Sequence, residues 1–238
     1  PSSPNIKPQK CDQFAIGYFR NFMNNNIETS VELFYKNIHN VIDFVDDAFF
    51  IGNIYVDGEV RAGKGRSYGA EFLVRKNFGN FTGWISYTYS RSLRTVKEIN
   101  FGEEYVSPYD RPHNISIVLN YAFNNRFDVS ASWVYNTGQP VTYPYGKYTV
   151  DGVTYSIYNG ERNKSRYPDY HRLDLSATWK CKQKHENWRG EWNLSIYNAY
   201  ARENAWAVIF IPQEDNTINT QKISLFSVIP SISYNFKF

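Results

Sequence analysis

Alternating apolar and polar residues fill most of this chain, and its final segment shows the pattern clearly. The two sets are interleaved there, Ile232, Tyr234, Phe236 and Phe238 against Ser231, Ser233, Asn235 and Lys237. Successive side chains of a β-strand point to opposite faces, so this pattern predicts a strand with one apolar and one polar face. Taken alone, the segment fits either an edge strand of a soluble sheet or a strand that closes a larger structure.

The same period of two predicts nine strands along the chain. They are expected over residues 14–23, 29–36, 66–78, 81–94, 113–123, 127–135, 171–179, 192–211 and 222–238. We expect a break inside the eighth strand, and a bend or bulge in the ninth at Pro230, because proline lacks a backbone donor. A small extra hairpin is expected between Tyr148 and Tyr158, turning at Asp151 and Gly152.

The predicted connections alternate between short and long. Tight turns are expected at residues 24–26, 79–80 and 124–125, and long loops at 39–65, 96–111 and 138–168. Most strands reach the ~9–11 residues that a tilted strand needs to cross a membrane, beyond the ~5–6 common in soluble sheets. Outer-membrane barrels have short periplasmic turns and long outer loops. The pattern therefore predicts an all-β, antiparallel transmembrane β-barrel, with a soluble β-sandwich or repeat protein as the alternative.

Composition agrees with a strand-rich protein. Aromatic residues make up 18% of the chain, with 20 Tyr, 17 Phe and 6 Trp, and methionine occurs once. Strand and turn formers therefore dominate over helix formers. The formal net charge of +3 is small and its basic residues are scattered, which does not favour a nucleic-acid partner. No signal peptide is recognised in the polar, proline-rich opening segment.

The strand count predicts how much of a barrel the chain supplies. If the short turns are periplasmic, nine strands begin outside the cell and end in the periplasm. A closed barrel of this type has an even number of strands, and an odd set would leave two unpaired edges in lipid. Residues 1–238 are therefore expected to be the C-terminal portion of a larger barrel. Cys11 and Cys181 would lie at opposite ends of it, beyond the ~7 Å between Cα atoms that a disulfide allows.

Five segments, in order, resemble the end of a TonB-dependent outer-membrane receptor. They are YDRPHNISI (109–117), TGQPVTYP (137–144), RYPDYHRLDLSATW (166–179), WNLSIYNAYARENAW (192–206) and ISLFSVIPSISYNFKF (223–238). The style is similar to that of Bacteroidetes receptors, particularly those with an N-terminal carboxypeptidase-regulatory-like domain. The resemblance implies about nine C-terminal strands of a 22-stranded barrel filled by a plug domain.

The resemblance also implies a function and its partners. Such receptors import scarce ligands such as iron chelates, haem, cobalamin, glycans or peptides across the bacterial outer membrane. The expected partners are the plug and N-terminal strands of the same receptor, the TonB complex reached through the N-terminal part, and outer-membrane lipid. A surface lipoprotein is left open, and no cofactor is expected. The alternative is a non-transporting outer-membrane scaffold for adhesion or assembly.

Three groups of residues are candidate functional positions. The aromatic and basic loop after the sixth strand suits ligand contact, because tyrosine offers flat apolar area with a polar tip; its candidates are Tyr143, Tyr145, Tyr148, Tyr155, Tyr158, Arg162 and Arg166. Loop packing and an interfacial aromatic girdle would explain the same residues. Arg172 and Asp174 are expected to face the lumen and its plug. Tyr234, Phe236 and Phe238 resemble the signal read by the barrel-assembly machinery.

Catalytic and metal sites are not favoured. Asp110, Arg111 and His113 fall at a loop-to-strand junction and are interpreted as an ion pair and an interfacial residue. His171 and Arg172, with Asp169 and Asp174, have the same interpretation. The acidic residues Asp43, Asp46 and Asp47 could together bind calcium, which needs several oxygen ligands, but a solvated acidic loop is favoured. The sequence therefore predicts no enzyme.

Overall fold

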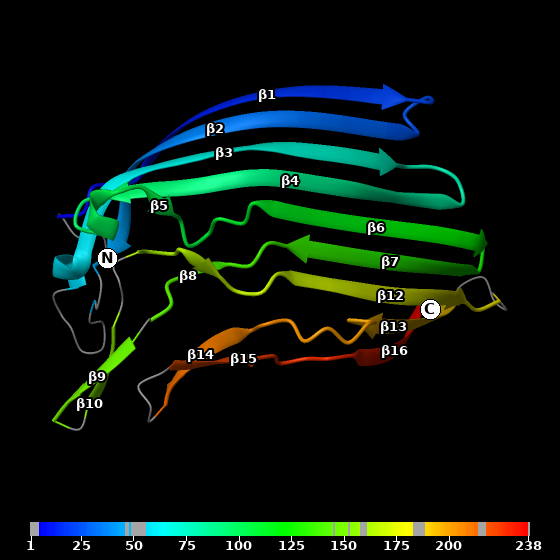
Figure 1. Ribbon diagram of the computed structural model, residues 1–238. Coiled ribbons are helices and arrows are strands. Elements are labelled where there is room, and N and C mark those ends of the chain that lie inside the picture. Colours follow the sequence, from blue (N-terminus) through cyan, green and yellow to red (C-terminus); the bar gives the residue numbers. More distant parts are fainter. Residues whose placement is uncertain are drawn as a thin grey trace.

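A computed structural model describes residues 5–45, 48, 56–144, 146–151, 153–157, 161–182, 189–213 and 218–237. These residues form a curved, open, antiparallel sheet (Figure 1). The main path runs in the order β1 (Lys10–Phe22), β2 (Ile27–Phe44), β3 (Val60–Lys76), β4 (Phe81–Val96), β6 (His113–Asn124), β7 (Phe127–Asn136), β12 (Tyr170–Lys180), β13 (Arg189–Tyr197) and β16 (Ile229–Lys237). The predicted all-β, antiparallel fold is confirmed, as a sector of a barrel wall.

The strands of the path place most of their large apolar residues on one common face, which we call the outward face. The register aligns Ile16 with Leu33, Leu175 with Ile196 and Leu194 with Ile232, so the apolar positions form continuous rows across the sheet. These side chains are open rather than packed, with Ile16 73% and Ile232 68% exposed. An apolar surface of this extent needs an apolar medium or a partner to cover it.

Aromatic side chains border the aliphatic middle of the outward face at both ends. At one end Tyr121 contacts Phe123, and Phe127 contacts Trp179. At the other end the rings of Tyr87 and His113 stack, as do those of Trp133 and Tyr135. Two aromatic girdles flanking an apolar band are characteristic of strands that cross a bilayer.

The two ends of the sheet carry different connections. One end, called the short-turn end, has tight turns such as the one in which Met23, Asn24 and Asn25 adopt positive φ. The side chain of Asn124 closes another by accepting from the backbone N–H groups of Arg126 and Phe127. The opposite, long-loop end carries all the longer excursions (Figure 1). The predicted alternation of short and long connections is confirmed.

The long-loop end contains short elements beyond the main sheet. They are the 3-10 turns η1 (Val56–Glu59) and η2 (Asn100–Gly102) and the strands β5 (Tyr105–Val106), β8 (Pro140–Val141), β9 (Gly146–Val150), β10 (Val153–Ile157), β11 (Ser165–Arg166), β14 (Ala207–Pro212) and β15 (Ile218–Ile223). Strands β9 and β10 form the predicted small hairpin, in which Asp151 adopts a positive φ. Strand β14 follows the predicted break after β13.

Three predicted strand boundaries are wrong. Strand β2 continues to Phe44, well past residue 36, through a bulge at Asn40, at φ 57°, that reverses the alternation. Strand β3 begins at Val60 rather than at residue 66, because it stays paired with this extension of β2, so the predicted loop 39–65 is shorter than expected. The last predicted strand, 222–238, is in fact divided between two strands, β15 and β16, which are separated by residues 224–228. Pro230 shows no bulge, since the register with Ile196 continues through it. Strand β16 ends the main path, and an edge strand tolerates proline.

The two ends of the path, β1 and β16, each pair with a single strand among the described residues. Cys11 lies at the long-loop end of β1 and Cys181 at the short-turn end, just after β12, as predicted, and both thiols are free. The described residues include no helix with the length and hydropathy needed to span a membrane.

Candidate functional site

The bulge at Asn40 turns Asp43 into the molecule, where it becomes the centre of a charged cluster. Asp43 is 8% exposed and accepts hydrogen bonds from the Tyr105 hydroxyl at 2.7 Å and from Arg162 at 3.0 Å. The guanidinium of Arg94 lies 3.5 Å from the same carboxylate. Burial, and then the bond to Asp43, raise the pKa of Tyr105. The cluster ties strands β2, β4 and β5 to the long loop that follows β7.

A second buried aspartate joins the same loop to β4. Asp110 is 1% exposed, and its carboxylate accepts from the backbone N–H of Ser92 at 2.6 Å and from Arg91 at 3.3 Å. Arg166 forms an ion pair with this carboxylate and also donates to the backbone oxygens of Asp110, at 2.8 Å, and Gly138, at 3.0 Å. We call the Asp43 and Asp110 clusters the two latches.

An apolar and amide core lies beside the latches. Val96, Ile99 and Tyr105 pack together with less than 5% exposure each. Asn163, 9% exposed and at φ 56°, donates from its side chain to the backbone oxygen of Val106 at 2.8 Å. A buried polar group is tolerated only when it is hydrogen-bonded, so the bond to Val106 fixes the position of the turn at Asn163.

The loop between β7 and β12 returns close to its own start. A Cβ atom on Gly138 would lie 1.7 Å from the backbone oxygen of Tyr167, so glycine is required at this crossing. Asp169 accepts from the Tyr135 hydroxyl at 2.6 Å and from the Gly138 N–H at 2.8 Å. The first of these bonds is the main cause of the lowered pKa of Asp169.

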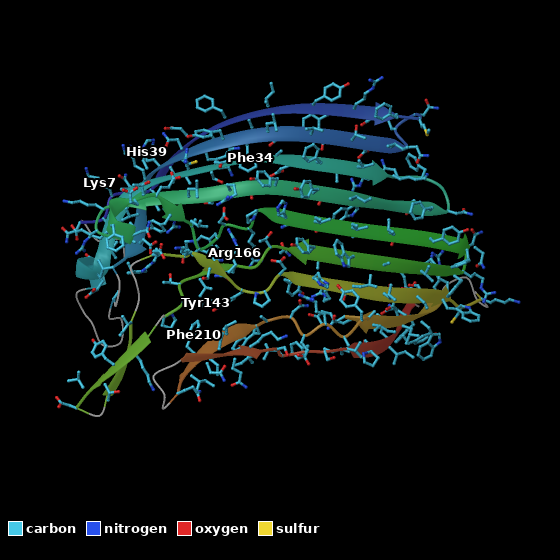
Figure 2. The ribbon with its side chains drawn as sticks, viewed as in Figure 1. Lys7, Phe34, His39, Tyr143, Arg166 and Phe210 are labelled. Carbon is cyan, nitrogen blue, oxygen red and sulfur yellow. The ribbon has the colours of Figure 1, made fainter. Side chains whose placement is uncertain are left out.

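The predicted ligand residues divide into four groups. Tyr143 is half-buried and lies between Arg166 and Phe210 (Figure 2). The centroids of the Tyr143 and Phe210 rings are 5.2 Å apart. Burial raises the pKa of Tyr143. Tyr148 is 52% exposed on β9, and its backbone pairs with that of Tyr155 on β10.

The other predicted ligand residues are either anchored or not described. Arg162 and Arg166 donate to the latches and so help to fix the loop. Tyr145 and Tyr158 lie outside the described residues.

Arg172 and Asp174 share the face opposite the apolar rows. Arg172 Nε donates to Asp174 at 3.0 Å, and its guanidinium lies 4.1 Å from the ring centroid of Tyr197. The other oxygen of Asp174 accepts from the backbone N–H of Asn198 at 2.9 Å. Asn198 is 1% exposed, at φ 55°, and donates to the backbone oxygens of Arg202 and Ser227. Asn198 therefore joins two irregular segments, the one between β13 and β14 and the one between β15 and β16.

The alternative catalytic and metal interpretations find no shared site among the described residues. Asp110 pairs with Arg91 and Arg166, whereas His113 Nδ1 lies 2.9 Å from the Tyr87 hydroxyl on the outward face. The expected solvated acidic loop is wrong for Asp43, which is buried among cations; Asp46 and Asp47 lie outside the described residues. No group of three metal-ligating side chains occurs in the described ranges.

Two of the three residues of the predicted assembly signal, Tyr234 and Phe236, lie near the end of β16. The Tyr234 ring contacts Trp192 at 4.7 Å and Phe236 at 6.2 Å between centroids. Phe238 lies outside the described residues.

The sequence analysis missed Asp43, Tyr105 and Asn198 as organising residues. For Asp43 the sequence did carry a signal: Asn40 stands between two alternating runs of opposite phase, which indicates a bulge.

Comparisons with known proteins place the chain in a family. No curated protein sequence matches it. It is similar in fold to the ferric-catecholate import receptor Fiu of E. coli K12, with a TM-score of 0.61, 16% identity, and coverage of 99% of this chain and 28% of that one. The ferripyoverdine receptor of the outer membrane of Pseudomonas aeruginosa gives a TM-score of 0.57 at 12% identity, with coverages of 98% and 27%.

The copper transporter OprC gives a TM-score of 0.56 at 13% identity, with coverages of 98% and 31%. The chain therefore spans less than a third of the length of these structures. The family model described as "TonB dependent receptor-like, beta-barrel" matches residues 1–199. This chain is an outer-membrane protein that belongs to the TonB-dependent receptor β-barrel family.

Proposed function

We propose that residues 1–238 form the C-terminal portion of the barrel of a TonB-dependent importer, built as about 22 strands around a plug. The observation that carries this proposal is the two-faced sheet with all its long connections at one end, in a chain of this family. In the proposed orientation the long-loop end is outside the cell and the short-turn end is periplasmic. The outward face then meets lipid, and the opposite face meets the lumen.

The long loop after β7 is proposed to contact the transported ligand. Tyr148 is exposed on the hairpin formed by β9 and β10, and Tyr155 lies directly across the pair. The two latches fix the base of this loop, which lowers the conformational entropy lost when a ligand binds. Tyr143, Tyr145 and Tyr158 are proposed as further contacts.

Two arginines at the base of the loop are proposed to act mainly by positioning it. The guanidinium groups of Arg162 and Arg166 already donate to Asp43 and Asp110. Their effect on a ligand would therefore pass through the placement of the tyrosines.

Further proposed contacts lie within the receptor and its membrane. Arg172 and Asp174 face the side where the plug would sit, and the TonB complex would be reached through the N-terminal part of the receptor. Tyr234, Phe236 and Phe238 are proposed to be read by the assembly machinery. The style of the five motifs supports a Bacteroidetes receptor of the carboxypeptidase-regulatory-like class. Its cargo would be a scarce ligand, for which the iron chelates carried by the fold relatives are one example.

The test uses the full-length receptor, with residues numbered as here. Its gene should encode an upstream plug domain and TonB box, and native mass spectrometry should detect a co-purified small molecule. Uptake of that molecule should require TonB. The variant Tyr148→Ala with Tyr155→Ala should reduce its retention, whereas Tyr18→Ala, an exposed outward-face tyrosine on β1, should not. A receptor gene without plug or TonB box would overturn the importer and support the scaffold alternative.

A further inference from the structure

A row of small polar side chains crosses the face of the sheet opposite the apolar rows, which we call the inner face. The strand register places six residues of six successive strands of the main path side by side: Thr82, Asn120, Ser130, Ser176, Ser195 and Ser231. None of the six is charged or larger than asparagine. Ser130 Oγ and Ser176 Oγ lie 2.6 Å apart and share a hydrogen bond. We call this set the hydroxyl row.

The neighbouring rows of the inner face also offer polar groups. On the short-turn side, the Asn193 side chain donates to the Thr178 hydroxyl at 3.0 Å. On the long-loop side, Ser132 lies opposite Asp174, whose carboxylate is held by Arg172 at 2.8 Å. This charged pair is closed on itself, so it presents no free charge to the rows beside it.

The polar surface extends along nearly the whole length of the wall. On β7 the inner-face positions run from Asn136 to Asp128 and are interrupted by one apolar residue, Val134, so they cover almost all of this 10-residue strand. A tilted strand crosses a membrane in ~9–11 residues. A continuous polar path therefore joins the long-loop end to the short-turn end.

Short side chains keep the wall low at the middle of this path. A hollow of about 320 Å³ lies there between β6, β7, β12 and β13, and Ser130, Ser176 and Ser195 lie along its floor. An object that rests on the longer side chains around the hollow would stand clear of this floor. The hollow is therefore suited to hold water or a passing polar group.

The inner face of β1 to β3, with the neighbouring Trp84 of β4, is built differently. Its side chains include Phe19, which is 69% exposed, and Phe34, whose ring lies over Gly69 so closely that a Cβ atom there would be 2.8 Å from it. Arg75 lies opposite Trp84. We call Phe19, Phe34, Arg75 and Trp84 the anchor sector.

The two parts of the inner face suit different contacts. Aromatic residues and arginine are enriched in the cores of protein–protein interfaces, whereas serine is depleted there and both serine and threonine are rare among residues that dominate binding. The anchor sector is therefore suited to close contact with a folded domain. The hydroxyl row is suited to a wet, loosely held surface.

We propose that the hydroxyl row lines the route by which a hydrated, hydrogen-bonding ligand passes between the wall and the plug, while the plug stays in contact with the anchor sector. Passage requires sites that bind well enough to admit a ligand and weakly enough to release it to the next site. Uncharged hydroxyl and amide groups about 6.6 Å apart along each strand, two residues at ~3.3 Å, meet this requirement. The inference rests on the proposed function, because it needs a plug and a transported ligand.

The test measures thiol reactivity in the full-length receptor with its native cysteines replaced by serine. Ser132→Cys and Ser195→Cys each place one thiol on the proposed route. Ser30→Cys is the matched control, because Ser30 lies on the inner face of β2 directly opposite Phe19. A small cationic methanethiosulfonate should modify the two route thiols at least about tenfold faster than the control thiol, because a thiol in a closed contact reacts only after local opening.

A second variant tests passage itself. Ser195→Trp fills the hollow and should remove most TonB-dependent uptake while the receptor still retains its ligand at the cell surface. A heat-dependent shift in gel mobility checks that each variant is folded. Normal uptake by a folded Ser195→Trp receptor would overturn the route.

The thiol rates also separate failure of the route from failure of the importer. Equal slow rates at the three positions, or a faster rate at the control, would overturn the route and leave the importer standing. Equal fast rates in a receptor whose gene encodes no plug would overturn both.

Discussion

The membrane wall and the long-loop end of this chain are stabilised in opposite ways. In the wall, large apolar side chains such as Phe14 and Ile232 stay 74% and 68% exposed, and adjacent strands are joined by the backbone ladder. All the buried hydrophobic residues of the described chain belong to the long-loop end: Val41, Val96, Ile99, Tyr105 and Val208. The wall therefore relies on lipid as its apolar medium, whereas the loops carry their own core.

The same contrast holds for charge. Asp43 and Asp110 at the long-loop end are buried between pairs of arginines. Charged pairs on the face opposite the apolar rows, such as Asp128 with Lys180, remain partly exposed. Breaking a buried ion pair leaves an uncompensated charge, whereas an exposed pair contributes little. Sensitivity to substitution should therefore differ sharply between the two regions.

The largest expected effect is at the second latch. Asp110→Ala leaves Arg91 and Arg166 without their shared carboxylate, which should destabilise the loop by about 3–5 kcal/mol. Hydrogen–deuterium exchange at β8 and β11 should then be at least about 100-fold faster, at 1.4 kcal/mol per tenfold. The control Asp128→Ala should lower stability by no more than about 1 kcal/mol. Equal effects of the two variants would contradict the contrast.

The next effect tests the two faces of the wall. Leu194→Arg places a charge in lipid and should destabilise the folded barrel by about 2–4 kcal/mol if it lies near the bilayer midplane. Ser195→Arg, one residue further on, should have a much smaller effect because its side chain points to the polar face. Urea titration of the full-length receptor in vesicles measures both. A larger loss for Ser195→Arg would reverse the assignment of the faces.

A smaller effect is expected where the loop crosses itself. Gly138→Ala brings a methyl group onto the backbone oxygen of Tyr167 and should cost about 1–3 kcal/mol of loop stability. Gly58→Ala adds a methyl group that meets nothing within 4 Å and serves as the control. The rate of trypsin cleavage after Lys164 reports loop opening. A similar rate for both variants would show that the crossing is not tight.

The smallest effect is on pH dependence. The pKa of Asp169 is lowered in the folded protein, chiefly by the bond from Tyr135. Its contribution to stability is therefore present above the unfolded pKa of about 3.9 and is lost as pH falls through the lower folded value. Exchange at the Gly138 amide should accelerate in this acidic range. Asp169→Asn should remove that dependence, and a variant that keeps it would assign the titration elsewhere.

How much could be predicted differs between these regions for a physical reason. In the wall, a residue's face follows from its parity in the strand, so Leu194, Ser195, Arg172 and Asp174 could be placed without a structure. At the long-loop end, Arg162 and Arg166 were predicted as ligand contacts. Their carboxylate partners lie 119 and 56 residues away in sequence, and no local pattern reports such a pairing.

The amino-acid sequence by itself determined the nine-stranded wall, its two faces and its alternating turns, because each depends on side-chain period and local turn chemistry. Tertiary structure alone decided that Asp43 and Asp110 each gather one arginine from β4 and one from the loop between β7 and β12, and that Asn198 joins two chain breaks. These features depend on which distant segments meet. That meeting is set by the packing of whole loops rather than by any single stretch of sequence.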